Sequence, residues 1–217
     1  VLTMSWGFDL MEDVHRNKWW EWVTRYTLKR STFFTSDAKV TRDTAVAYGM
    51  DSKKTIVFAW GVDLEHFKPS TFNLRPLTFT LFCNRSWEMR YGVDVLASAF
   101  VKVAQQNENV DLILLGGGSQ GNYLRHIFQI GGVLDRVTFG GQISQTDLPR
   151  WYHMADLYIS PSHVDGSSVS LMEALACGLP VVGFDSGALT ELVAGDAGRV
   201  VPYGVNPWKL ETPDIPA

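Results

Sequence analysis

Residues 161–191, PSHVDGSSVSLMEALACGLPVVGFDSGALTE, decide the fold of this chain. The apolar run 156–160 ends immediately before Pro161, as expected for a strand of a sheet that is covered on both faces. A turn rich in Gly and Ser follows, and apolar residues then recur at helical spacing until Gly178. The pattern predicts a helix over 169–177 that begins at the carboxyl end of a parallel strand. Open α/β sheets bind phosphorylated ligands at this place, because free N–H groups and the helix dipole point there.

Two carboxylates flank the turn, Asp165 in the loop and Glu173 inside the predicted helix. Ser170 and Glu173 fit a capping box, in which the glutamate only serves the start of the helix. The alternative interpretation places both acids in a ligand site. Both interpretations fit this pattern taken alone.

The same stretch resembles the acid–seven residues–acid signature of retaining GT-B glycosyltransferases, the group that includes glycogen synthase and many bacterial mannosyl- and glucosyltransferases. Asp165 and Glu173 are the two acids, followed by ALACGLPVV and by Ser186-Gly187-x3-Glu191. The first acid of the family is usually Glu, so Asp165 is a departure with a shorter arm. The resemblance implies that Glu173 holds the ribose hydroxyls and that Asp165 and the backbone of residues 166–168 hold the donor sugar.

A second element follows the predicted strand 77–83. The segment from Asn84 to Gly92 resembles the family's Gly-Arg-x4-Lys-Gly element, whose two cations hold the donor diphosphate. Arg85 matches the family Arg, and Arg90 stands at the Lys position with Tyr91 as an extra residue. Two solvated surface arginines are the alternative. The resemblance implies no cofactor and no metal, because fixed positive charge already stabilises the leaving diphosphate.

A glycine-rich loop, LGGGSQG at 115–121, contains Gly-x-Gly-x-x-Gly between a predicted strand and a predicted helix. A dinucleotide site also needs an acid at the end of the next strand, and that strand ends in Gly140-Gly141 instead. The dehydrogenase interpretation is therefore weak. In the family resemblance this loop and residues 139–143 line the nucleotide cleft. The predicted donor-binding residues are Gly116, Gly117, Gln142, Ile143, Gly166, Ser167, Ser168 and Val169.

Strand and helix patterns alternate along the chain, which predicts an α/β fold with parallel sheets and helices on both faces. In GT-B terms, residues 1–72 are part of an N-terminal, acceptor-side Rossmann-like domain with a linker at 70–76, and residues 73–217 are a Rossmann-like donor domain with an irregular tail from 202. The predicted strands are 1–4, 32–35, 55–59, 77–83, 111–115, 136–139, 156–160, 180–184 and 198–201. The predicted helices are 10–30, 37–48, 93–106, 120–130, 145–154, 169–177 and 188–194.

The predicted helix 10–30 is amphipathic, with Trp19, Trp22 and Tyr26 on one face. We expect this aromatic face to pack on a sheet, since such faces usually form the core. The alternative is that the helix lies on a membrane surface, which suits a lipid-linked acceptor. Just before it, the segment Trp6-Gly7-x-Asp9 resembles an acceptor-side motif that often has His at the position of Trp6, so Asp9 is the candidate there.

Composition bounds the remaining choices. The 217 residues are 46% hydrophobic and 19% charged, with a net charge of −4 and no basic stripe, which argues against nucleic-acid binding. Cys83 and Cys177 are expected to be free thiols. No apolar run is long enough to span a membrane and the start of the sequence lacks a signal-peptide pattern, so the expected location is the cytoplasm, including the inner face of the membrane.

The function that these residues imply is transfer of a sugar from a UDP- or GDP-sugar to a glycan or a lipid-linked acceptor, with retention at the anomeric carbon. Two alternatives remain open. One is a nucleotide-sugar-binding fragment without turnover, and the other is a GT-B nucleotide-sugar epimerase.

Overall fold

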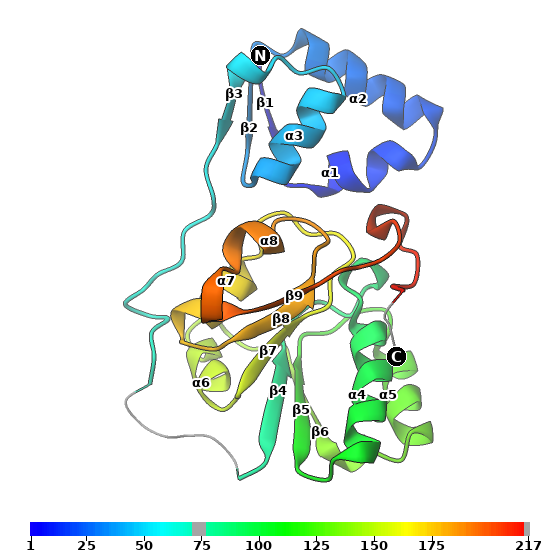
Figure 1. Ribbon diagram of the computed structural model, residues 1–217, viewed down its shortest axis with the longest axis vertical. Helices are drawn as coiled ribbons and strands as arrows, with labels where there is room; N and C mark the ends of the chain where they lie inside the picture. Colours follow the sequence, from blue (N-terminus) through cyan, green and yellow to red (C-terminus); the bar gives the residue numbers. More distant parts are fainter. Residues whose placement is uncertain (71–76, 215–217) are drawn as a thin grey trace.

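The computed structural model describes residues 1–70 and 77–214, and it contains two parallel sheets with their helices, one above the other in Figure 1. We call them the N-terminal unit and the C-terminal unit. All strand pairs in both sheets are parallel, as predicted. The predicted linker lies almost entirely outside the described residues, so the domain boundary at residue 72 stays a prediction.

The N-terminal unit has a three-stranded sheet in the order β1-β2-β3. Its helices lie to one side of the sheet in Figure 1. Its elements are β1 (Leu2–Ser5), α1 (Phe8–Met11), α2 (Lys18–Arg30), β2 (Phe33–Ser36), α3 (Lys39–Ala47) and β3 (Thr55–Val57).

The C-terminal unit has a six-stranded sheet in the order β6-β5-β4-β7-β8-β9. The reversal of order between β4 and β7 makes this a doubly wound sheet, with ligands expected at the carboxyl ends of the central strands. Its strands are β4 (Phe79–Cys83), β5 (Val110–Leu115), β6 (Val137–Gly141), β7 (Leu157–Ser160), β8 (Val181–Phe184) and β9 (Gly198–Val201). Its helices are α4 (Val93–Gln106), α5 (Gly121–Ile130), α6 (Leu148–His153), α7 (Val169–Ala176) and α8 (Leu189–Leu192).

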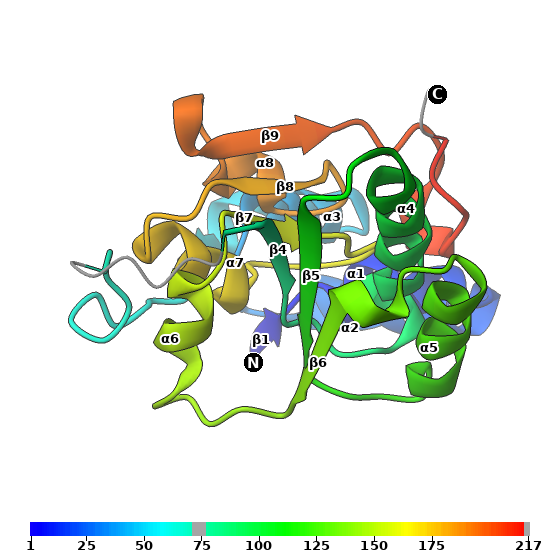
Figure 2. The same ribbon diagram turned by 90° about the horizontal axis from the view of Figure 1, so that it is seen from below.

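Side chains along the central strands point alternately to the two faces of the sheet, so the C-terminal unit has two hydrophobic cores. Phe82 and Ile113 face α6 and α7, whereas Leu81 and Leu112 face α4 and α5; Figure 2 shows these helices on opposite sides of the sheet. Along β7 to β9, however, the side next to α4 is an apolar groove of about 830 Å³. Phe79 and Leu81 of β4 also line this groove, so the prediction that helices cover both faces does not hold for the whole sheet.

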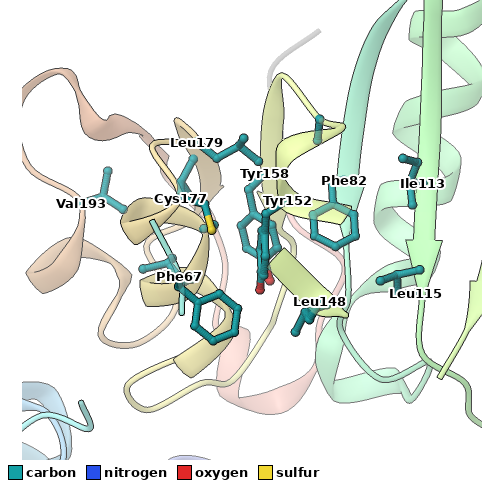
Figure 3. Packing of buried hydrophobic residues seen from close by; sticks show 14 of the residues in the cluster. Phe67, Phe82, Ile113, Leu115, Leu148, Tyr152, Tyr158, Cys177, Leu179 and Val193 are labelled. Atoms are coloured by element: carbon teal, nitrogen blue, oxygen red, sulfur yellow. The ribbon is translucent and has the colours of Figure 1, made fainter. Parts of the chain in front are cut away.

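Two tyrosines lie at the centre of the core between the sheet and α6. Tyr152 and Tyr158 are fully buried, and the Tyr152 ring meets Phe82 edge to face with 5.0 Å between centroids. Their hydroxyl oxygens point the same way, as Figure 3 shows. Both cysteines are buried and free, as predicted, and burial raises the pKa of the Cys83 thiol to about 11.

The predicted helix 10–30 is wrong in two respects. The helical part is divided, because Asn17 caps α2 by accepting hydrogen bonds from Trp19 N at 3.0 Å and Trp20 N at 3.1 Å. The aromatic face also points to solvent instead of packing on a sheet: Trp19 is 66% exposed and Trp22 is 54% exposed. Within α2 the buried residue is Leu28, on another face of the helix.

Candidate functional site

The site lies where β4 and β7 end side by side. These strands pair directly, so the segment after β4 and the loop after β7 emerge at the same edge of the sheet. Arg85 from the first and Asp165 from the second form an ion pair of 2.7 Å between Nη2 and Oδ2. Arg85 Nη1 also donates to Ser168 Oγ at 3.0 Å and to Ser170 Oγ at 3.1 Å, next to the start of α7. The structure thus brings together one predicted cation, one predicted acid and the predicted helix N-terminus.

The electrostatics of this pair follow from its burial. The side chains of Arg85 and Asp165 are 12% and 17% exposed. Burial raises the pKa of Asp165, although the charge of Arg85 opposes this change. Burial is the largest influence on the pKa of Arg85 and acts to lower it, but Asp165 together with Tyr158, Tyr91 and Cys83 outweighs burial, so the pKa of Arg85 rises. Arg85 therefore remains a cation at the site and also lies over the ring of Tyr91, 4.5 Å from its centroid.

Glu173 is 3% exposed and points into the core side of α7. It accepts hydrogen bonds from Gln145 Nε2 at 2.7 Å and from the Tyr152 hydroxyl at 2.8 Å. The capping box is therefore wrong: α7 has Ser168 as its N-cap, and Glu173 bonds side chains of other elements. Because each carboxylate oxygen has two acceptor positions, Glu173 can accept further hydrogen bonds beside these two. Burial raises the pKa of Tyr152 well above its ordinary value, so its hydroxyl stays protonated.

The backbone of Arg90 contacts the loop after β7, whereas its side chain points away from that loop. His163 N donates to Arg90 O at 2.9 Å. The guanidinium, however, lies over Phe8 at 4.7 Å from the ring centroid and 3.3 Å from Glu12 Oε1, both in the N-terminal unit. Within the described residues, the two predicted cations thus have different partners.

The glycine-rich loop packs against the segment that follows Arg85. Trp87 N donates to Gly117 O at 3.0 Å, and Gly116 N donates to Gly141 O at 2.6 Å. Gly116 has φ of +103°, which favours glycine, whereas a Cβ on Gly117 would meet open space.

The remaining predicted donor-side residues lie at two strand ends. Gln142 is exposed and follows β6, and Ile143 is half-buried against the core. In the loop after β7, Ser167 and Ser168 are 7% and 5% exposed, and Val169 opens α7 at 41% exposed.

The two units meet in contacts that we call the seam. Asp37, which follows β2, accepts from Ser167 N at 2.7 Å through Oδ2. Glu191 at α8 accepts from Lys39 N at 2.9 Å and from Val40 N at 2.8 Å, and so caps α3 from the other unit. A Cβ on Gly166 would lie 2.7 Å from Trp6 O, so the glycine allows the two backbones to meet.

Asp9, the predicted acceptor-side candidate, is exposed on α1 and accepts from Ser5 Oγ at 2.7 Å.

Sequence reasoning missed several polar residues of this region. Asp37, Gln145 and Tyr152 had no assigned role. Asp37 precedes a helix, a position at which Asp is usually taken for a cap, so no local signal separates it from an ordinary helix start.

Comparison with known proteins identifies the family. The glycosyl transferases group 1 family matches residues 78–210, more than half of the chain. A GDP-mannose-dependent α-(1-6)-phosphatidylinositol monomannoside mannosyltransferase of Mycobacterium tuberculosis is 29% identical over 151 residues, covering 61% of this chain and 38% of that protein. D-inositol 3-phosphate glycosyltransferase 2 of Catenulispora acidiphila is 30% identical, covering 76% and 42%. The chain thus spans about two fifths of the length of these relatives.

Solved structures agree on the fold. The Anabaena protein HepE in complex with UDP-glucose has a TM-score of 0.79 at 21% identity, over 96% of this chain and 60% of that one. Sucrose-phosphate synthase of Thermosynechococcus elongatus has a TM-score of 0.78 at 24% identity, over 93% and 54%. With its two parallel Rossmann-like sheets and the family match over most of the C-terminal unit, this chain belongs to the glycosyl transferases group 1 and has the GT-B fold.

Proposed function

We propose that this chain carries the donor site of a retaining glycosyltransferase that moves a sugar from a UDP- or GDP-sugar to a glycan or lipid-linked acceptor. The observation that carries the proposal is the ion pair of Arg85 with Asp165 at the start of α7. A cation that is 12% exposed, next to free helix N–H groups, is suited to a diphosphate. Such fixed positive charge stabilises the charge that develops on a leaving diphosphate.

The roles of the other residues follow from their positions. Arg85 turns from Asp165 to the diphosphate, and Arg90 exchanges Glu12 for the same ligand. Asp165 and the backbone of residues 166–169 then bind the hydroxyls of the donor sugar. Glu173 accepts the ribose hydroxyls.

Residues near the glycine-rich loop complete the nucleotide site in this proposal. Gly117 offers an open backbone surface, and Gln142 and Ile143 follow β6 at the same edge of the sheet. Recognition of the base by backbone groups agrees with the presence of both GDP- and UDP-linked sugars among similar proteins, one a GDP-mannose-dependent mannosyltransferase and one solved with UDP-glucose.

The stereochemistry of the product tests this function. We expect incubation with UDP-glucose or GDP-mannose and an alcohol acceptor to give an α-glycoside from the α-linked donor, as seen in the proton NMR spectrum of the first product. A β-glycoside would contradict retention. If the donor binds but no product forms, the result supports a nucleotide-sugar-binding fragment without turnover. If the sugar of the donor is epimerised when no acceptor is present, the result supports the epimerase.

We also propose that the acceptor is reached at a membrane surface through α2. Trp19, Trp22 and Tyr26 stack in sequence with centroid separations of 5.3 Å for both neighbouring pairs, and Arg30 lies 4.5 Å over Tyr26. Exposed aromatic rings next to cations are typical of helices that lie in the interface of anionic bilayers. Among the described residues, no helix has the length and apolar character needed to cross a bilayer.

Replacement of Trp19 and Trp22 by Ala is expected to weaken sedimentation with phosphatidylglycerol vesicles roughly tenfold or more, since each indole buries a large apolar surface. Leu134→Ala, at a surface apolar residue of the other unit, is the matched control. Equal binding of all three proteins to the vesicles would contradict the proposed membrane contact.

A further inference from the structure

We propose that Asp37 binds a hydroxyl of the donor sugar, so that the sugar is held from both units at once. This inference rests on the proposed function, because it assigns the sugar end of the same donor site. Asp37 comes from the N-terminal unit, at the end of β2, and lies 130 positions in sequence from the loop that it contacts.

The first argument is the position of the carboxylate. Its Oδ2 accepts from Ser167 N at 2.7 Å, and Ser167 Oγ donates to Asp37 O at 2.7 Å. A Cβ on Gly166 would lie 2.5 Å from the same Oδ2 and 3.1 Å from Oδ1. Asp37 therefore lies against the backbone that, in the proposed function, binds the donor sugar together with Asp165.

The second argument is the unused oxygen. Asp37 is 6% exposed, and its Oδ1 is buried without a hydrogen bond to any described residue. A buried carboxylate oxygen without a donor is costly, and the cost disappears when a ligand hydroxyl donates to it. The nearby negative charge of Asp165 adds to this cost, since Asp37 contributes to the raised pKa of Asp165. Hydroxyl donors relieve both carboxylates, whereas phosphate oxygens do not.

The third argument is the contrast with the other carboxylate of the seam. Both oxygens of Glu191 are occupied, because Lys39 N and Val40 N donate to Oε2 and Oε1 respectively. Glu191 thus acts as a clamp between the units. In Asp37, Oδ2 makes a similar contact between the units, whereas Oδ1 has no hydrogen bond to a described residue. Oδ1 is the oxygen that we assign to the sugar hydroxyl.

The experiment compares Asp37→Asn with Glu191→Gln by calorimetric titration of UDP, UDP-glucose, GDP and GDP-mannose. Asn can still accept from Ser167 N, so the clamp survives while the charged acceptor is lost. We expect Asp37→Asn to leave the Kd of the nucleoside diphosphate within about twofold and to weaken the matching nucleotide-sugar roughly tenfold, the usual effect of losing a hydrogen bond to a charged group. Glu191→Gln should change the Kd of the nucleoside diphosphate and the Kd of the nucleotide-sugar by the same factor.

Other outcomes overturn the inference. If Asp37→Asn and Glu191→Gln both change the two ligands by equal factors, Asp37 is a clamp and not a sugar ligand. If Asp37→Asn changes neither ligand, the free oxygen has no role in donor binding. If none of the four ligands binds to the unmodified protein, the donor site itself fails, and the role of Asp37 fails with it.

Discussion

Replacement of Arg85 by Ala is expected to weaken binding of the nucleoside diphosphate about a hundredfold or more. Arg85 is the buried cation at the start of α7, and charge-assisted hydrogen bonds to phosphate are about twice as strong as neutral ones. Arg85→Lys keeps the charge but loses the planar fork of the guanidinium. Its Kd should therefore lie between those of the unmodified protein and Arg85→Ala. The measurement is calorimetric titration with the nucleotide that binds.

Arg42→Ala is the matched control for this loss of charge. Arg42 lies on α3 and forms a surface ion pair with Asp43, which contributes little to stability. Its removal changes the net charge equally and should leave the Kd unchanged. If Arg42→Ala weakened the nucleotide as much as Arg85→Ala, the effect would belong to the overall charge and not to the site.

The Arg85→Ala protein should also be less stable than the unmodified protein, and the difference should depend on pH. Removal of one partner from a buried pair costs roughly 3–5 kcal/mol, because Asp165 is left as an uncompensated charge. Burial already raises the pKa of Asp165, and without Arg85 it rises further. The folded state then binds a proton more tightly than the unfolded state, so stability falls as the pH rises through the folded pKa. The deficit in melting temperature against the unmodified protein should be larger at pH 7 than at pH 4.5; a constant deficit would show that Asp165 does not titrate in this range.

Glu173→Gln is expected to remove recognition of the ribose. Glu173 is 3% exposed and is held by Gln145 and Tyr152, so its carboxylate is fixed in one position. We expect the unmodified protein to bind the 2′-deoxy or 3′-deoxy nucleotide roughly tenfold more weakly than the ribonucleotide, by loss of a hydrogen bond to a charged group. The Glu173→Gln protein should bind all three with nearly equal Kd.

Tyr152→Phe is the control for an indirect effect. It removes the hydroxyl that donates to Glu173 at 2.8 Å and keeps the Glu173 carboxylate, which Gln145 still holds. This variant should still discriminate between ribose and deoxyribose. Full discrimination by Glu173→Gln would refute the assigned role of Glu173.

Local patterns were sufficient for the elements and for part of the site. The apolar periodicity gives α4 at the predicted 93–106, because this helix has one buried face. Strand β9 also has the predicted bounds, 198–201. Arg85 and Asp165 could be predicted as neighbours, since both follow parallel strands whose carboxyl ends share an edge of the sheet.

What failed depends on contacts between distant segments. The aromatic face of α2 was expected in the core, but periodicity identifies a face and not the neighbour that covers it. Glu173 fitted a capping box, and its partners Gln145 and Tyr152 come from outside its helix. The contact of Asp37 with Ser167 joins two units, and no pattern within either segment encodes it.

The most direct test of the central claim is titration of UDP, GDP and ADP into the unmodified protein and into Arg85→Ala, with EDTA present. The account predicts that one of the three binds without metal and that Arg85→Ala weakens it about a hundredfold, because fixed positive charge at the end of β4 holds the diphosphate. If none binds, or if the same nucleotide binds both proteins equally, the site at Arg85 and Asp165 is not the donor site.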